Sequence, residues 1–116
     1  MNKYNITEEN IYLYCVEYYD EEMAQLDYKE HKKKYPEIVD FYDYLSNYDG
    51  YEYAYQFSDY FYSKQEAKKL AKLLSKKNKE FAFIRRYYTY INFENKIDWE
   101  FDEDYNPEQF SNGKEI

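Results

Sequence analysis

Hydrophobic and polar residues alternate most regularly near the end of the chain, over residues 97–102. A strand with this period carries three large apolar side chains on one face and three carboxylates on the other: Ile97, Trp99 and Phe101 against Asp98, Glu100 and Asp102. We expect the apolar face to be core and the acidic face to be exposed. Residues 81–93 also have the composition of a strand, so residues 81–104 predict a long β-hairpin with its turn near residues 94–96.

Two further segments have the composition of strands. Residues 10–19 are rich in β-branched and aromatic side chains, and both faces are mostly apolar, which is typical of a strand inside a sheet. Residues 51–58 (YEYAYQFS) place an aromatic side chain at every second position, which favours another strand. Between these segments, residues 47–50 (NYDG) predict a turn.

Three helices are predicted. Asp20 suits the N-cap of a first helix, which must end before Pro36. Pro36 in turn suits the first turn of a second helix, since apolar residues follow it at helical spacing. Ser63 and Glu66 match a capping box. Apolar residues then recur at the spacing of one helix face, which predicts a third helix over residues 64–77 with its lysines on the solvated side.

The predicted order is β-α-α-β-α-β-β, within a single domain of residues 1–104. We expect an α+β fold, a two-layer sandwich with a mixed four-stranded sheet and helices on one face. The strands at 51–58 and 81–93 would be parallel and joined by the third helix in a right-handed βαβ unit. Residues 105–116 have no periodic pattern and are expected to form a loose C-terminal tail.

Composition changes the expected core and surface. Tyrosine accounts for 19 of the 116 residues, so aromatic rings are expected to fill much of the core while their hydroxyls reach its rim. The formal net charge is −8, yet residues 64–86 contain nine basic and only two acidic residues. A basic segment therefore separates two acidic ones. The acidic chain as a whole is expected to be attracted to basic proteins and repelled by nucleic acid.

Few residues in the chain suggest catalytic chemistry. His31 is the one histidine and Cys15 the one cysteine, so we predict no disulfide, no Cys/His metal site and no Ser-His-Asp or Cys-His catalytic set. Two glycines cannot form a glycine-rich phosphate-binding loop. The chain is therefore predicted to be non-enzymatic, without a cofactor. It has neither an apolar signal segment nor an apolar run of about 18 residues, and we expect a cytoplasmic protein.

Two surfaces are candidates for binding. The first is acidic and rich in tyrosine. Its carboxylates, spaced along one face of a strand, would imitate the charges of a nucleic-acid phosphate backbone, with only a loose match of the two spacings. Its predicted partner-binding residues are Asp98, Glu100, Asp102, Glu103, Asp104, Glu52, Tyr88 and Tyr90. The second is the lysine-rich helix with the neighbouring arginine pair, whose charges would meet nucleic-acid phosphates. Its alternative nucleic-acid-binding residues are Lys68, Lys72, Lys76, Arg85 and Arg86.

The acidic segments YYDEE (residues 18–22) and IDWEFDED (residues 97–104), in a small chain without a catalytic set, resemble the class of small phage-encoded inhibitors that includes anti-CRISPR proteins and other DNA mimics. The resemblance implies a protein-binding inhibitor, encoded by a phage or mobile element. Such an inhibitor blocks a basic nucleic-acid-binding host defence protein, such as a CRISPR effector nuclease, in the host cytoplasm. The lysine-rich helix departs from the acidic character of that class.

Two alternatives to the inhibitor stay open. One is a small nucleic-acid-binding protein that uses the helix at 64–77 together with Arg85 and Arg86. The other is an antitoxin-like assembly partner, whose surface would look the same. The chain is expected to act as a monomer or homodimer without membrane association.

Overall fold

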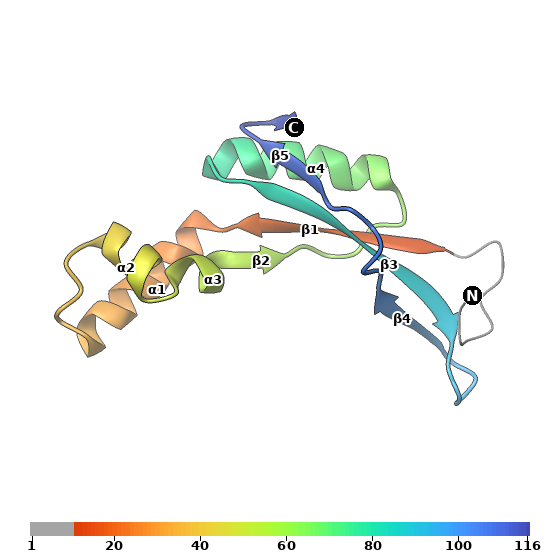
Figure 1. Ribbon diagram of the computed structural model, residues 1–116, viewed down its shortest axis with the longest axis horizontal. Helices are drawn as coiled ribbons and strands as arrows, with labels where there is room; N and C mark the ends of the chain where they lie inside the picture. The colour runs from red at the N-terminus through yellow and green to blue at the C-terminus, as the bar shows by residue number, and fades with distance from the viewer. Residues whose placement is uncertain (1–10) are drawn as a thin grey trace.

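The computed structural model describes residues 11–116 and has an α+β fold (Figure 1). Its strands are β1 (Tyr12–Tyr19), β2 (Tyr55–Phe57), β3 (Ala82–Ile91), β4 (Ile97–Phe101), β5 (Glu108–Ser111) and β6 (Lys114–Glu115). Its helices are α1 (Glu21–Lys34), α2 (Phe41–Asn47), α3 (Gly50–Ala54) and α4 (Lys64–Asn78). Asn10, the predicted first residue of the first strand, and the rest of residues 1–10 of the predicted domain lie outside the described residues.

The six strands form one sheet, and every strand pairing within residues 11–116 is antiparallel. The order is β2-β1-β3-β5-β6, and β4 pairs with the part of β3 that lies beyond β5. The mixed four-stranded sheet predicted from the sequence is therefore incorrect in its strand number and in its parallel pairing. β2 and β3 do run in the same direction, but β1 lies between them, so they form no parallel ladder.

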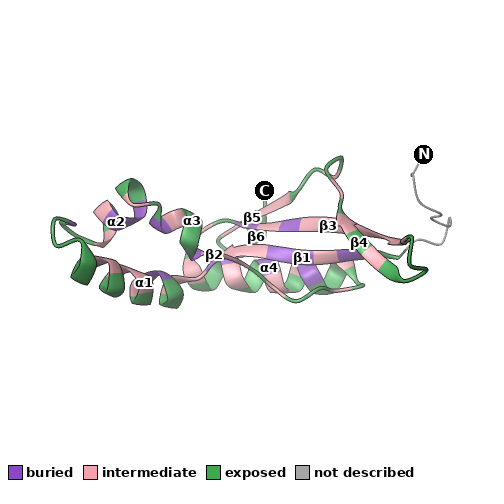
Figure 2. Ribbon diagram, turned by 90° about the horizontal axis from the view of Figure 1, so that it is seen from below, coloured by how far each residue is buried: buried purple, intermediate pink, exposed green. Residues whose placement is uncertain are grey.

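Helix α4 covers one face of the sheet, over β1, β3 and β5 (Figures 1 and 2). It begins as predicted, because the Ser63 hydroxyl accepts a hydrogen bond of 3.3 Å from the Glu66 N–H. The core between helix and sheet consists of side chains with no exposed surface: Val16, Ala67, Ala71, Ala82, Ile84 and Phe110. The small alanines on α4 let the helix pack closely onto the aromatic and branched side chains of the strands.

Helices α1, α2 and α3 pack on one another at one end of the sheet and lengthen the molecule to 54 Å (Figure 1). As predicted, Asp20 caps α1 by accepting a hydrogen bond from the Met23 N–H at 3.1 Å, and α1 ends before Pro36. The second helix begins later than predicted, at Phe41, where Asp40 is the cap. The buried residues of this helical lobe are Tyr19, Ala24, Ile38, Tyr44, Leu45 and Ala54.

Residues 51–58, predicted to be a strand, begin instead as the short helix α3 and become β2 only at Tyr55. Their alternating pattern fits a strand, but packing inside the helical lobe outweighs it. Ala54 is buried there, and Gly50 lies so close to Tyr44 that a Cβ atom on it would be 2.6 Å from the ring carbon Cε2. A helical turn with a glycine at its start satisfies both contacts.

Residues 105–116, expected to be a loose tail, form the last two strands and belong to the folded domain. β5 pairs with the start of β3, and the side chain of Phe110 is fully buried against α4. Asn112 and Gly113 have positive φ angles of 52° and 83°, as a two-residue hairpin turn between β5 and β6 requires. The Gly113 N–H also donates to the Ser75 hydroxyl at 2.9 Å, which ties this turn to α4.

Glu108, at the start of β5, holds the C-terminal strands to α4. Its carboxylate forms ion pairs with Lys64 and Lys68 and accepts a hydrogen bond from the Tyr105 hydroxyl at 2.8 Å. Burial alone would raise the pKa of this carboxyl, but the hydrogen bonds from Lys64 and Tyr105 and the charges of both lysines lower it below the ordinary value of 4.5.

The lowered pKa of Glu108 predicts a specific dependence of stability on pH. The stabilisation is present above the ordinary pKa of 4.5 and is lost as the pH falls through the lower folded-state pKa. Glu108→Gln is therefore expected to lower the free energy of unfolding by about 1–3 kcal/mol at neutral pH, with a smaller difference in acid. Urea unfolding followed by circular dichroism at several pH values measures this. Glu94→Gln, at a side chain that is 74% exposed, is the matched control; an equal loss at all pH values would contradict the assignment.

Candidate functional site

The β3–β4 hairpin extends beyond the part of the sheet that α4 covers (Figure 1). At one end of its ladder the Asp102 N–H donates to the Arg86 carbonyl at 3.0 Å, and at the other end the Asn92 N–H donates to the Lys96 carbonyl at 2.9 Å. Asn95 in the loop has a φ of 60°, which confirms the turn predicted near residues 94–96. Both faces of the far half of this hairpin lack a covering helix among residues 11–116.

The apolar face of β4 is exposed, which contradicts the expectation that it is core. Ile97, Trp99 and Phe101 have 76%, 46% and 43% of their surface exposed. Figure 2 shows these exposed positions alternating with half-buried ones along β4. The reason is the position of α4, which packs on the other face of the sheet and nearer its centre, so no second layer from residues 11–116 covers these side chains.

Four rings on this uncovered face form an aromatic patch, which consists of Tyr60, Tyr87, Trp99 and Phe101. Tyr60 lies edge-on to Tyr87 and to Trp99, with ring centroids 5.3 and 5.7 Å apart, and Tyr87 lies 5.5 Å from Phe101. Burial, with the nearby Cys15 thiol and Tyr60, raises the pKa of Tyr87 to about 12, so its hydroxyl is neutral at physiological pH. The aromatic patch is therefore an uncharged, partly exposed surface.

A pocket of about 380 Å³ continues the aromatic patch toward β2. It is lined by Glu17, Phe57, Arg85, Tyr87 and Phe101. Arg85 donates two hydrogen bonds to one oxygen of Glu17, at 3.1 and 2.7 Å, so the charged groups of this pocket are paired with each other. A bound side chain would therefore meet aromatic rings around a neutralised ion pair.

The acidic face of β4 is half-buried, although it was expected to be a free row of carboxylates. Glu100 accepts a hydrogen bond from the Tyr88 hydroxyl at 2.8 Å, and this bond, with burial, raises the pKa of Tyr88 to about 12. Asp102 accepts two hydrogen bonds from Arg86, at 2.9 and 2.6 Å. Asp98 is half-buried on the same face. It accepts a hydrogen bond of 2.8 Å from the Trp99 N–H, so all three carboxylates already have partners within the protein.

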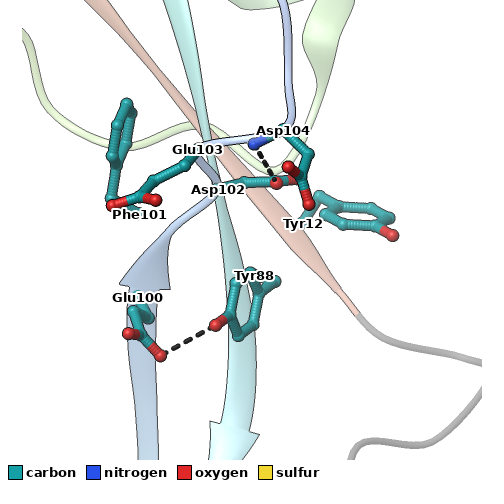
Figure 3. A pocket seen from close by; sticks show the side chains of 7 residues that line it. All are labelled: Tyr12, Tyr88, Glu100, Phe101, Asp102, Glu103 and Asp104. Atoms are coloured by element: carbon teal, nitrogen blue, oxygen red, sulfur yellow. Dashed lines mark hydrogen bonds between the residues drawn. The ribbon is translucent and has the colours of Figure 1, made fainter. Parts of the chain in front are cut away.

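A pocket of about 340 Å³ lies between this acidic face and the start of β1 (Figure 3). It is lined by Tyr12, Tyr88, Glu100, Phe101, Asp102, Glu103 and Asp104. Glu103 and Asp104 are exposed, and the Asp104 N–H donates to Asp102 at 3.2 Å. The structure thus brings most of the predicted acidic residues together. Within residues 11–116 no group of three or more acidic, histidine or cysteine side chains is arranged to hold a metal ion.

Two other predicted partner-binding residues lie in different places. Tyr90 is beside Tyr88 on the hairpin, with ring centroids 6.3 Å apart. Glu52, expected on the same sheet face, is instead exposed on α3 at the opposite end of the molecule (Figure 1). The misplacement follows from the helical conformation of α3, and Glu52 is not part of the hairpin surface.

The arginine pair of the alternative nucleic-acid site is split by the strand. Arg85 and Arg86 are consecutive residues of β3, so they project to opposite faces of the sheet. Arg85 is paired with Glu17 and Arg86 with Asp102, at 2.7 and 2.6 Å. Both guanidinium groups are therefore engaged within the protein.

The three lysines of that alternative site lie on α4. Lys68 is within 3.6 Å of Glu108 and 3.5 Å of Glu115, so its charge is partly balanced. Lys72 and Lys76 are exposed, one turn apart. The structure leaves a small exposed basic surface on α4 that is separate from both arginines.

His31 lies in the helical lobe, far from the hairpin (Figure 1). Its Nδ1 is 3.6 Å from an Asp27 carboxylate oxygen, and the Tyr44 hydroxyl donates a hydrogen bond to the same carboxylate. Burial, reinforced by this hydrogen bond, raises the pKa of Tyr44. These contacts link α1 to α2, so packing within the helical lobe explains where His31 lies.

Comparison of the chain with protein-family models, with curated proteins and with solved structures found no match. No helix between residues 11 and 116 is long and apolar enough to cross a membrane.

Proposed function

We propose that this protein is a non-enzymatic inhibitor that binds a basic, nucleic-acid-binding host defence protein, such as a CRISPR effector nuclease, through the end of its β3–β4 hairpin. The observation that carries the proposal is the pairing of two uncovered surfaces on one projecting element. One is the aromatic patch, and the other is the pocket lined by carboxylates. A phage or mobile element is the expected source of such an inhibitor.

The two surfaces have different tasks in this proposal. Large aromatic side chains that become fully buried in a complex contribute most of the binding free energy of protein interfaces. Trp99 and Phe101 are such side chains, and the pairing of β4 with β3 holds them in place before binding. Exposed charges contribute more to the rate of association and to choice of partner. Glu103 and Asp104 would attract a basic groove and orient the hairpin toward it.

In this proposal, only acidic side chains at the rim of the interface imitate the phosphates of a nucleic acid. Because Asp102 is paired with Arg86 and Glu100 with Tyr88, these carboxylates are poorer substitutes for phosphates than a free row would be. Glu103 and Asp104, which are exposed after the end of β4, would still imitate phosphates. The proposed inhibitor therefore competes with nucleic acid mainly by occupying its groove with aromatic anchors.

Direct nucleic-acid binding by α4 is the competing function, and the exposed pair Lys72 and Lys76 is the observation in its favour. The net charge of −8 and the engaged arginines oppose it. A gel shift with single- and double-stranded DNA and RNA at low salt separates the two functions. A shift that disappears in Lys72→Glu/Lys76→Glu would favour direct binding over inhibition.

The inhibitor is tested by adding the full-length protein to a panel of guide-RNA-loaded CRISPR effector nucleases and measuring cleavage of a matched DNA target. Stoichiometric loss of cleavage by at least one effector is the expected result. Complex formation on a sizing column should accompany it. Full cleavage by every effector at a large excess of the protein would remove this class of partner.

Reversing the exposed charges should slow association without removing the anchors. Glu103→Lys/Asp104→Lys is expected to lower the association rate about tenfold at low salt, and this difference should fade as salt screens the charges. Surface plasmon resonance at several salt concentrations against the inhibited effector measures it. Glu37→Lys/Glu52→Lys, which makes the same charge change in the helical lobe, is the control. Equal rates for both variants would mean that only net charge matters.

A further inference from the structure

The outer edge of β4 is open. The bonds that join Asp102 to Arg86 and Asn92 to Lys96 fix which residues of β4 face β3. In an antiparallel ladder, residues alternate between pairing with the neighbour and facing away from it. The backbone N–H and C=O groups of Ile97, Trp99 and Phe101 therefore point to the outer edge. No other strand between residues 11 and 116 pairs with that edge.

β4 also lacks three of the features that protect edge strands in other proteins. Lysine, proline or a bulge usually interrupts such an edge and prevents pairing with another chain. The sequence IDWEF has none of these, and its ladder with β3 is continuous from Ile97 to Phe101. One protecting contact is present, since the Asp98 carboxylate accepts a hydrogen bond of 2.8 Å from the Trp99 N–H. This carboxylate oxygen accepts the hydrogen bond that a backbone carbonyl of an added strand would otherwise accept.

We infer that the outer edge of β4 binds an extended segment of the partner by β-strand addition, and that this segment alternates apolar and basic residues. The inference rests on the proposed function and specifies how that partner is recognised. Side chains directly opposite in a ladder share a face of the sheet. Apolar residues of the segment would extend the face of Ile97, Trp99 and Phe101, and its lysines or arginines would lie beside Asp98 and Glu100.

Charge complementarity favours a basic segment over a second copy of this chain. Two β4 strands paired antiparallel about Trp99 would place Asp98 of one copy directly opposite Glu100 of the other, and like charges in that position are destabilising. The net charge of −8 on each copy adds to the repulsion. A basic segment removes both costs. It also pairs with the Asp98 carboxylate, which is released when the incoming carbonyl takes the Trp99 N–H.

The edge can be tested without knowing the partner. The probe is a blocked peptide of about seven residues that alternates lysine and valine, long enough to span β4. Trp99 is the one tryptophan of the chain, so its fluorescence reports directly on β4. We expect saturable fluorescence change and about tenfold slower amide hydrogen exchange at Trp99 and Phe101, measured by NMR on the full-length protein. Three control peptides should not bind: one with its lysines and valines in separate blocks, one with N-methylated valines, and one with glutamate in place of lysine.

Several results would overturn strand addition. These are no binding of the alternating peptide, equal binding of its N-methylated form, or slowed exchange only at residues outside β4. Concentration-dependent self-association of the protein, with the same protection of the Trp99 amide, would instead assign the edge to a second copy and overturn the basic segment.

A variant of Ile97 separates failure of this inference from failure of the proposed function. Ile97→Pro removes one outward N–H at the first residue of the edge strand, a position where proline is tolerated, and leaves Trp99 and Phe101 in place. Against the inhibited effector we expect inhibition to weaken by about tenfold or more, and clearly more than in Ile97→Ala, which also loses the apolar side chain but keeps the outward N–H. Full inhibition by Ile97→Pro, with lost inhibition by variants of Trp99, would refute strand addition and leave the proposed function standing.

Discussion

Phe110→Ala is expected to lower the free energy of unfolding by about 3–5 kcal/mol, the largest effect of any single substitution predicted for this protein. The Phe110 side chain has no exposed surface and lies among Val16, Ile84 and the alanines of α4. Removing its ring leaves a cavity that the surrounding strands can fill only in part. A loss of this size is a large fraction of the stability of a small domain, about 5–15 kcal/mol in total.

Chemical denaturation followed by circular dichroism measures the effect of this substitution. Phe57→Ala is the matched control, because the Phe57 side chain is 58% exposed and its removal should change the stability by no more than about 0.5 kcal/mol. If Phe110→Ala were as stable as Phe57→Ala, the C-terminal strand would not be part of the core.

The burial of Phe110 also shows why the C-terminal strands escaped prediction. The residues around it are polar, and one phenylalanine gives no periodicity. The useful signal was Asn112-Gly113, since an Asn-Gly pair is the preferred two-residue hairpin turn, and both residues have the positive φ angles that this turn needs. The sequence therefore held the evidence for β5 and β6 in its turn and not in its hydrophobic pattern.

Elements with a local cause were predictable from the sequence. Asp20 and Ser63 cap the helices that they were expected to cap, and the β3–β4 hairpin turns where Asn95 allows a positive φ. In each case, neighbours in the sequence supply the hydrogen bond or conformation. The strand prediction for residues 51–58 failed because packing between α2 and α3, and not a local signal, favours the helix. The close approach of Gly50 to Tyr44 is part of that packing, and a periodic pattern does not reveal it.

The same limit applies to the candidate site. Strict alternation divided β4 correctly into an apolar and an acidic face, but it could not say where α4 would pack. The acids around Glu100 and Asp102 do gather at one pocket, yet Arg86 and Tyr88 partly neutralise or bind them. The sequence predicts that the aromatic face is core, because large apolar side chains are usually buried. Its exposure moves the expected source of binding energy from the carboxylates to the rings.

Trp99→Ala is accordingly expected to weaken inhibition by roughly 30- to 700-fold, the effect of removing an interface anchor worth about 2–4 kcal/mol. The Trp99 ring is 46% exposed and contacts Tyr60 at its edge, so it has surface left to bury in a complex. Most of the change should appear as faster dissociation, because the exposed acids that promote association are unchanged. Titration of the inhibited nuclease with wild-type and variant protein, together with the dissociation rate, measures both quantities.

A control for this substitution must remove an exposed aromatic ring from another part of the surface. Tyr42→Ala serves, since Tyr42 is 71% exposed on α2 at the other end of the molecule. It is expected to inhibit like the unmodified protein, and both variants should keep the circular dichroism spectrum of the fold. The proposal places the side chains that contribute most of the binding free energy in the aromatic patch. Undiminished inhibition by Trp99→Ala would therefore exclude the patch as the interface. Inhibition lost in Tyr42→Ala would place the interface on the helical lobe, where Glu52 also lies.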